Sequence, residues 1–285
     1  MSLHHPTPGT RAATDTATHG AMITAPFTYA VNTGVKPVNE TFAEGDIRRH
    51  RTGAFESHAM PVRNGRLAQG LGLDSSGFLC VDHHTTMQDF LDPLEVREVY
   101  HEEMRQLVAR QTGAQRVVLF DHTIRSGDSA EREARKLREP VLSVHNDYTE
   151  WSGPQRVREL LPEEAESLLA RRFAIVQVWR SIAPVVESNP LGLIDARTVT
   201  SGDLIASERR YPNRIGETYQ VSFNPAHAWS YFPHLRREEA IVFKVYDSAK
   251  DGRARFTPHS AFVDPTAPAN AAPRQSIEAR MIAFF

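Results

Sequence analysis

The sequence is poor in cysteine, in net charge and in long apolar segments, and each shortage excludes a class of protein. Cys80 is the only cysteine, so the chain forms no internal disulfide and has too few thiolates for a cysteine-rich structural zinc site. The formal net charge of −2 gives no electrostatic case for binding nucleic acid. No apolar run approaches the roughly 18 residues of a membrane span, so we expect no contact with a membrane.

The amino-terminal segment lacks the apolar stretch of a secretory signal. Thr, Ala, His and Gly dominate MSLHHPTPGTRAATDTATHGAM, and this composition predicts a disordered lead-in over residues 1–25. We therefore expect a cytoplasmic protein with a single domain over residues 26–285, since β-rich chains of this length commonly fold as one unit.

Two segments have the periodicity of helices. Over about residues 92–112, Asp92 is placed to cap the first turn, Pro93 takes the first helical position and Gly113 supplies the stop. Apolar side chains recur between them at helical spacing. A second helical stretch is expected over about residues 154–172, with an interruption at Pro162. Both helices would brace the rest of the fold.

The remaining signals are those of β-strands, over residues 116–120, 173–179, 191–199, 218–223, 240–246 and 276–285. Neither a G-x-G-x-x-G nor a P-loop pattern occurs, which argues against a nucleotide-binding sheet. Helices concentrated ahead of the later strands favour a mainly β fold with flanking helices over alternating βαβ units. We expect a double-stranded β-helix, that is, a jelly roll with a cupin-like core.

The tripeptide His145-Asn146-Asp147, which follows the apolar run VLSV, is the first candidate for chemistry. Residues i and i+2 of an extended segment project to one face, so the imidazole and the carboxylate can meet at one point. A second histidine would complete the two-His, one-carboxylate triad of non-haem Fe(II) oxygenases. The candidates are His227 and His259, which lie 80 and 112 residues past Asp147 (227 − 147 and 259 − 147).

The carboxyl-terminal segment PRQSIEARMIAFF alternates with a period of two. Arg274, Ser276, Glu278 and Arg280 share one face of this expected strand, and apolar residues fill the other. A buried arginine is costly unless it meets an anion, and its planar fork suits a carboxylate. Arg274 with Ser276 is thus placed to hold the distal carboxylate of a 2-oxo acid. The alternative is an arginine at a strand end that pairs with a surface acid.

About three quarters of the chain, from Leu73 onward, carries a family resemblance in the order and spacing of nine segments: GFLCVDHHTTMQDF, VVLFDHTIRS, VHNDYTEWSGPQRV, IVQVWRSI, PLGLIDARTV, HAWSYFP, EEAIVFKVYDS, FTPHSAF and PRQSIEAR. These segments resemble the AsaB hydroxylase/desaturase family of fungal and bacterial secondary metabolism. That family is similar to Fe(II)/2-oxoglutarate-dependent dioxygenases.

The resemblance implies iron on His145, Asp147 and a second histidine, and it favours His259 over His227. It also implies that 2-oxoglutarate is held by an Arg-x-Ser element, with Arg280 as the reserve for Arg274. If His227 were the ligand instead, Lys244 in the following strand would take the co-substrate.

The activity implied by the resemblance needs Fe(II), 2-oxoglutarate and O2. An Fe(IV)-oxo species would abstract a hydrogen from a small natural product, and hydroxylation, desaturation or cyclisation would follow. The side chains expected to contact the substrate are Tyr148, Trp179, Arg180 and His227. Two alternatives remain: a metal-dependent hydrolase or isomerase on a similar barrel, and a barrel that binds a small ligand without catalysis.

Overall fold

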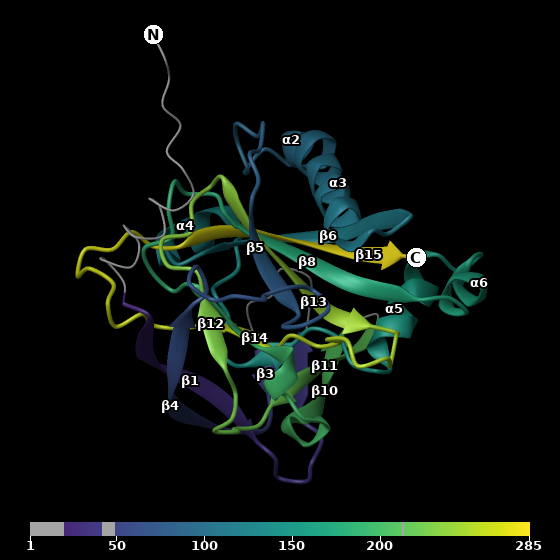
Figure 1. Ribbon diagram of the computed structural model, residues 1–285, viewed down its shortest axis with the longest axis horizontal. Coiled ribbons are helices and arrows are strands. Elements are labelled where there is room, and N and C mark those ends of the chain that lie inside the picture. Colours follow the sequence, from purple (N-terminus) through teal and green to yellow (C-terminus); the bar gives the residue numbers. More distant parts are fainter. Residues whose placement is uncertain (1–19, 42–48, 213) are drawn as a thin grey trace.

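Two β-sheets face each other in the protein, a computed structural model that describes residues 20–41, 49–212 and 214–285 (Figure 1). The larger sheet contains, in spatial order, β1 (Met22–Val31), β4 (Ala54–Asn64), β12 (Trp229–Tyr231), β9 (Leu191–Ile194), β14 (His259–Ala261), β7 (His145–Asn146), β11 (Arg214–Val221), β10 (Leu204–Tyr211), β2 (Val38–Thr41) and β3 (Arg49–Arg51). The smaller sheet contains β5 (Phe78–Asp82), β13 (Glu239–Asp247), β8 (Phe173–Ser181), β15 (Gln275–Phe284) and β6 (Arg116–Ser126). This arrangement is the expected jelly roll.

The smaller sheet is covered on both faces, which explains why its central strands are buried along their whole length. In β8, Phe173, Ile175 and Trp179 pack into the core between the sheets, whereas Val176 and Val178 pack outward beneath the helical layer. In β15 the predicted alternation is confirmed, because the apolar face from Ile277 to Ala283 also packs outward. The face that carries Arg280 is therefore turned towards the larger sheet.

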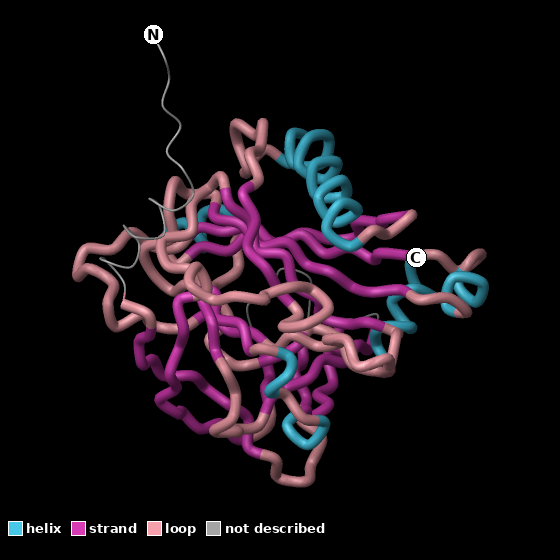
Figure 2. The backbone as a smooth tube through the Cα atoms, in the orientation of Figure 1, coloured by secondary structure: helices cyan, strands magenta, loops and turns pink. Residues whose placement is uncertain are grey.

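The predicted helices are confirmed and lie outside the sheets (Figure 2). The first comprises α2 (Pro93–Glu95), a π-helical turn η1 (Val96–Tyr100) and α3 (His101–Thr112). Asp92 caps it through Leu94 N and Glu95 N, and Gly113 ends it with a φ of 72°. The second stretch is divided around Pro162 into α5 (Ser152–Leu160) and α6 (Ala165–Leu169).

Shorter elements complete the described chain: α4 (Ser129–Arg135) and the 3₁₀ turns η2 (Ala196–Thr198) and η3 (Ser201–Asp203). The expected strand over residues 191–199 is shorter than predicted, because Asp195 accepts a hydrogen bond from Arg197 N and caps the turn η2. None of the described helices is long and apolar enough to span a membrane.

β1 begins at Met22, inside the stretch 1–25 that was expected to be a disordered lead-in, whereas residues 1–19 lie outside the described ranges. The reason is the alternation in MITAPFTYAV. Ala25, Phe27 and Tyr29 are buried on one face, so this strand contributes a row of side chains to the core.

Candidate metal centre

Two histidines face each other on neighbouring strands at the centre of the larger sheet. His145 of β7 and His259 of β14 are direct cross-strand partners, and their ring centroids lie 4.5 Å apart. Asp147 follows two residues after His145, and its Oδ1 lies 3.6 Å from His145 Nε2. The three side chains offer ligand atoms that all lie within 4.8 Å of one another. A chance His-x-Asp tripeptide would not bring a third ligand to this point.

Backbone carbonyls fix the orientation of both imidazoles. His145 Nδ1 lies 2.8 Å from Ser143 O, and His259 Nδ1 lies 3.0 Å from Thr257 O. Because a carbonyl oxygen only accepts, each Nδ1 must donate the hydrogen bond, which leaves Nε2 as the ring nitrogen that can face a metal. Burial and the neighbouring His259 lower the pKa of His145 to about 3, so its ring is neutral. Two imidazoles and one carboxylate are the donor set that suits Fe(II).

The carboxylate of Asp147 is held by the opposite sheet. Gln177 Nε2 of β8 donates to its Oδ2 at 2.5 Å, and Arg280 Nε of β15 lies 3.4 Å from the same oxygen. Burial acts to raise the pKa of Asp147, but the positive charge of Arg280 outweighs it and keeps that pKa well below its usual range. With Oδ2 taken by two donors, Oδ1 is the oxygen available to a metal.

Arg274 and Ser276 have buried polar atoms without partners. Arg274 is only 3% exposed, donates from Nη1 to Asn189 O at 2.8 Å and lies 5.3 Å from the centre of the Trp179 ring. Within the described chain, Arg274 Nε and Ser276 Oγ make no hydrogen bond. Burial, followed by repulsion from Arg125, lowers the pKa of Arg274 to about 9. Such unpaired buried donors fit an anionic ligand, because leaving them empty is costly.

Arg280 differs from Arg274 in that its donors are already used. Its Nη1 donates to Asp121 and Thr123 at 3.0 and 2.9 Å, its Nη2 contacts Glu278, and its Nε faces Asp147. A guanidinium surrounded by carboxylates has little capacity for another anion. The geometry therefore favours Arg274 over Arg280 as a site for the co-substrate.

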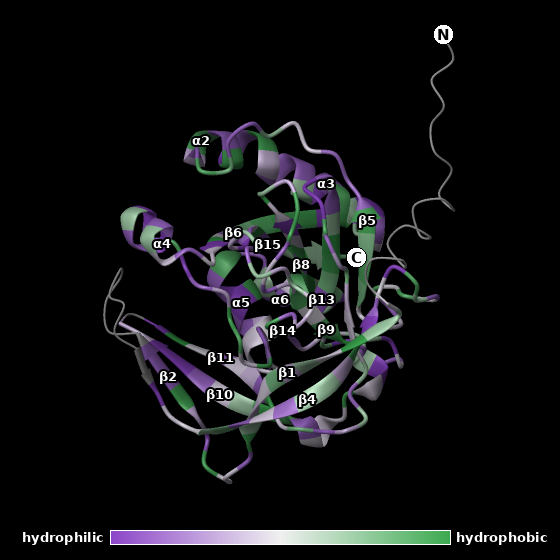
Figure 3. Ribbon diagram, turned by 90° about the vertical axis from the view of Figure 1, so that its left-hand side faces the viewer, coloured by the Kyte–Doolittle hydropathy of each residue, from purple (hydrophilic) through white to green (hydrophobic). Residues whose placement is uncertain are grey.

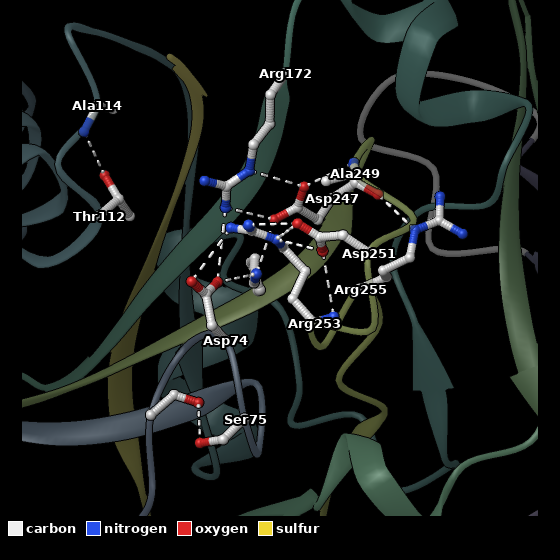
Figure 4. A network of polar contacts seen from close by, with 12 residues as sticks. Asp74, Ser75, Thr112, Ala114, Arg172, Asp247, Ala249, Asp251, Arg253 and Arg255 are labelled. Atoms are coloured by element: carbon white, nitrogen blue, oxygen red, sulfur yellow. Dashed lines mark hydrogen bonds and ion pairs between the residues drawn. The ribbon is translucent and has the colours of Figure 1, made fainter.

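His227 and Lys244 lie away from the three clustered ligands. His227 stacks on Tyr29 and places its Nε2 3.3 Å from Asp203 Oδ2. Lys244 lies on the outer face of β13, where its ammonium meets Asp74 and Asp247 at 2.7 and 2.8 Å. Figure 4 shows the surrounding network, in which Arg172 also contacts Asp247. These positions give both residues structural partners of their own.

The structure places only some of the side chains expected at the substrate beside the cavity. Tyr148 lies on the wall of a cavity of about 520 Å³ that reaches His145, Asp147 and Arg280. Trp179 is buried in the core between the sheets. Arg180 is on the opposite face of β8, where it donates to Arg237 O and lies 2.5 Å from His83 Nδ1. The alternation of β8 thus turns Arg180 away from the cavity.

Two residues near the metal centre are not among those predicted from the sequence. Gln177 was read as part of an apolar strand, although a single polar side chain inside the run FAIVQVW is a signal of an internal partner. Arg125 of β6 pairs with Ser276 across the strands and lines the cavity. Its sequence context gave no such indication, because only the pairing of β6 with β15 brings it to this face.

Comparisons with known proteins agree with this site. A family model described as "Oxidoreductase/YMDC permease-like domain" matches residues 26–284. The chain is 32% identical to hydroxylase/desaturase CTB9 of Cercospora beticola over 81% of this chain and 78% of that protein. It is 30% identical to hydroxylase/desaturase efuI of Hormonema carpetanum over 90% and 95%, respectively.

Among solved structures, the iron and alpha-ketoglutarate-dependent endoperoxidase NvfI superposes with a TM-score of 0.80 at 25% identity, over 93% of this chain and 98% of that one. All these relatives are oxidoreductases, which favours the oxygenase interpretation over a hydrolase, an isomerase or a non-catalytic barrel. The chain therefore belongs to this oxidoreductase family and, within it, to the hydroxylases and desaturases related to Fe(II)/2-oxoglutarate-dependent dioxygenases.

Proposed function

We propose that His145, Asp147 and His259 bind Fe(II), and that Arg274 with Ser276 binds the distal carboxylate of 2-oxoglutarate. Residues 26–285 would then act as one oxygenase domain that oxidises a small natural product in the cavity beside the metal. The observation that carries this proposal is the convergence of two imidazoles, both oriented through Nδ1, and one carboxylate at a single point.

Bound Fe(II), with 2-oxoglutarate and O2, supplies the oxidising power to remove hydrogen from a substrate C–H bond. The protein supplies geometry. The β7 and β14 pairing sets the spacing of the two histidines, and the carbonyls of Ser143 and Thr257 hold their rings. Gln177 and Arg280 hold Asp147 from the facing sheet, so both sheets define the centre.

The cavity wall beside His145 and Asp147 would hold the substrate carbon to be oxidised. Hydroxylation, desaturation and cyclisation differ in where the substrate hydrogens lie relative to the metal. The relatives include proteins named as hydroxylases, desaturases and an endoperoxidase, so we infer one of these oxidations of a small molecule for this enzyme. The lone thiol of Cys80 agrees with a cytoplasmic enzyme.

The proposal is tested by anaerobic titration with Fe(II) of the wild type, His259→Ala and His227→Ala. We expect His259→Ala to lose tight Fe(II) binding, since it removes one of three ligands, and His227→Ala to retain it. His227→Ala is the matched control because it deletes an equally buried imidazole from the same protein. Retained binding in His259→Ala together with lost binding in His227→Ala would refute the assignment.

A further inference from the structure

The part of the cavity wall near the Tyr211 end of β10 is rich in arginine. On this strand Ser207, Arg209 and Tyr211 face the cavity, whereas Arg210 points the other way and pairs with Glu208. The strand register places Arg209 opposite Asn39, and Asn39 opposite Arg51. Arg209 and Arg51 therefore lie in one row across three strands (Figure 3, where β2 and β10 carry hydrophilic residues).

Most carboxylates on the cavity wall are already neutralised. The pairs are Asp121 and Asp147 with Arg280, Glu159 with Arg156 and Arg214, and Glu217 with Lys36. Only the exposed Glu139 has no ion pair within the described ranges. The same wall carries Arg51, Arg138 and Arg209, which meet no carboxylate in the part of the chain that the structure describes. We call these three residues the cationic rim.

The arginines of the cationic rim act electrostatically on neighbouring side chains. Burial would raise the pKa of the Tyr211 phenol, but Arg209, Arg214 and Arg138 lower it below its usual value, with Arg209 as a hydrogen-bond donor. Burial and the nearby Arg209 in turn lower the pKa of Arg51. Positive charges that repel one another in this way would be stabilised by a shared anion.

Apolar side chains also line the cavity. Leu142, Trp151 and Ile215 line the cavity and are 47%, 50% and 56% exposed, although large apolar groups usually avoid water. Tyr148 adds an aromatic surface close to Asp147. A ligand that covered these side chains would need an apolar body.

The register also gives the offset along the strands between the cationic rim and the metal centre. His145 pairs with Gln220, and Gln220 pairs with Ile205. Arg209 lies four residues beyond Ile205, so the cationic rim is roughly 13 Å along the strand from the level of His145. This separation distinguishes the rim from Ser276 on the facing sheet and from Arg274, which directly precedes β15; both are assigned to 2-oxoglutarate.

We propose that the cationic rim binds a carboxylate of the substrate, so that this oxygenase acts on an organic acid with an apolar body and its acidic group remote from the oxidised carbon. Arg209, with its planar fork at the centre of the row, makes the principal contact. This inference rests on the proposed function, because it takes the metal centre as the place of oxidation.

The test uses two probes of equal shape, biphenyl-4-carboxylate and biphenyl-4-carboxamide, and measures their binding by calorimetry. The enzyme is loaded with Fe(II) and saturating 2-oxoglutarate without oxygen, so that the co-substrate site is filled. We expect the acid to bind the wild type at least tenfold more tightly than the amide. Arg209→Gln should remove this preference, and Arg210→Gln, the matched control on the other face of the same strand, should keep it.

Equal affinities for the two probes in the wild type, no binding of either at millimolar concentration, or a preference that persists in Arg209→Gln would overturn the inference. Failure of the proposed function is separate, because it appears as absent Fe(II) or 2-oxoglutarate binding before any probe is added. If Arg209→Gln weakened 2-oxoglutarate binding instead, the cationic rim would belong to the co-substrate and the inference would be wrong.

Discussion

Gln177 is the side chain whose removal tests most directly how the metal centre is built. It is fully buried in β8, and its Nε2 donates to Asp147 Oδ2 at 2.5 Å, while its own Oε1 has no partner in the described chain. In Gln177→Leu the carboxylate loses a charge-assisted hydrogen bond, worth about 1.5–3 kcal/mol. Asp147 would then be held by Arg280 alone, and Oδ1 would no longer be fixed towards the two imidazoles.

The expected result is a loss of Fe(II) affinity of about 10- to 100-fold, as is typical when a partner that orients a metal ligand is removed. The metal-free protein should change less, because leucine has a similar volume and also removes the unpaired Oε1. Anaerobic competition titrations give the Fe(II) dissociation constant, and urea unfolding gives the stability of the metal-free protein.

Gln155→Leu is the control. It replaces the same residue type by leucine on the cavity wall, at a position without a contact to Asp147. An unchanged Fe(II) affinity in Gln177→Leu would refute the reasoning, because the hydrogen bond would then play no part in holding the ligand. A large loss of stability with unchanged affinity would assign Gln177 to the core alone.

Three further predictions concern other parts of the molecule. Arg274→Lys should weaken 2-oxoglutarate binding about 30-fold or more at unchanged Fe(II) affinity, because a lysine cannot reproduce the planar fork of arginine. Absorbance titration of the Fe(II) protein with 2-oxoglutarate measures this affinity, and equal binding by the variant and the wild type would contradict the co-substrate assignment. Asp247→Asn should destabilise the protein by about 3–5 kcal/mol in urea unfolding, because it removes a counter-charge from the buried Lys244 and from its neighbour Arg172. Asp251→Asn, in the exposed turn nearby, should leave the free energy of unfolding almost unchanged. The metal-free protein should lose stability as the pH falls from about 6.5 towards 3. The pKa of His145 is lowered to about 3 in the folded protein, so in this range the histidine is protonated in the unfolded chain but not in the folded one, and protonation favours unfolding. His145→Gln should flatten this part of the pH dependence, and an unaltered slope would show that other groups cause it.

The local features of the chain could be predicted from the sequence because they depend on neighbours within a few residues. Asp92 and Gly113 bound the first helix through hydrogen bonds and a positive φ that involve only adjacent backbone. The alternation in β15 separates Ser276 and Arg280 from the apolar face by the geometry of any extended strand. His145 and Asp147 could be paired for the same reason.

The choice between distant partners could be made only from the tertiary structure. His227 and His259 are equally good imidazoles in the sequence, and the pairing of β14 with β7 brings one of them to His145. The outward face of β8 turns Arg180 away, although it follows Trp179 directly. Register between strands far apart in the chain sets these positions, and no short-range pattern encodes it.

For the co-substrate and the substrate, the sequence determined which residue types are available, and the fold decided which of them remain unpaired. Arg274 directly precedes β15 and Arg280 lies within it, yet the carboxylates of Asp121 and Asp147 occupy Arg280, whereas Arg274 keeps a free donor. The same holds for Arg209, whose place beside Asn39 and Arg51 arises from three strands that meet only in the folded sheet. An arginine whose donors are already paired with acids of the protein has few left for a ligand, and that pairing depends on packing between distant segments.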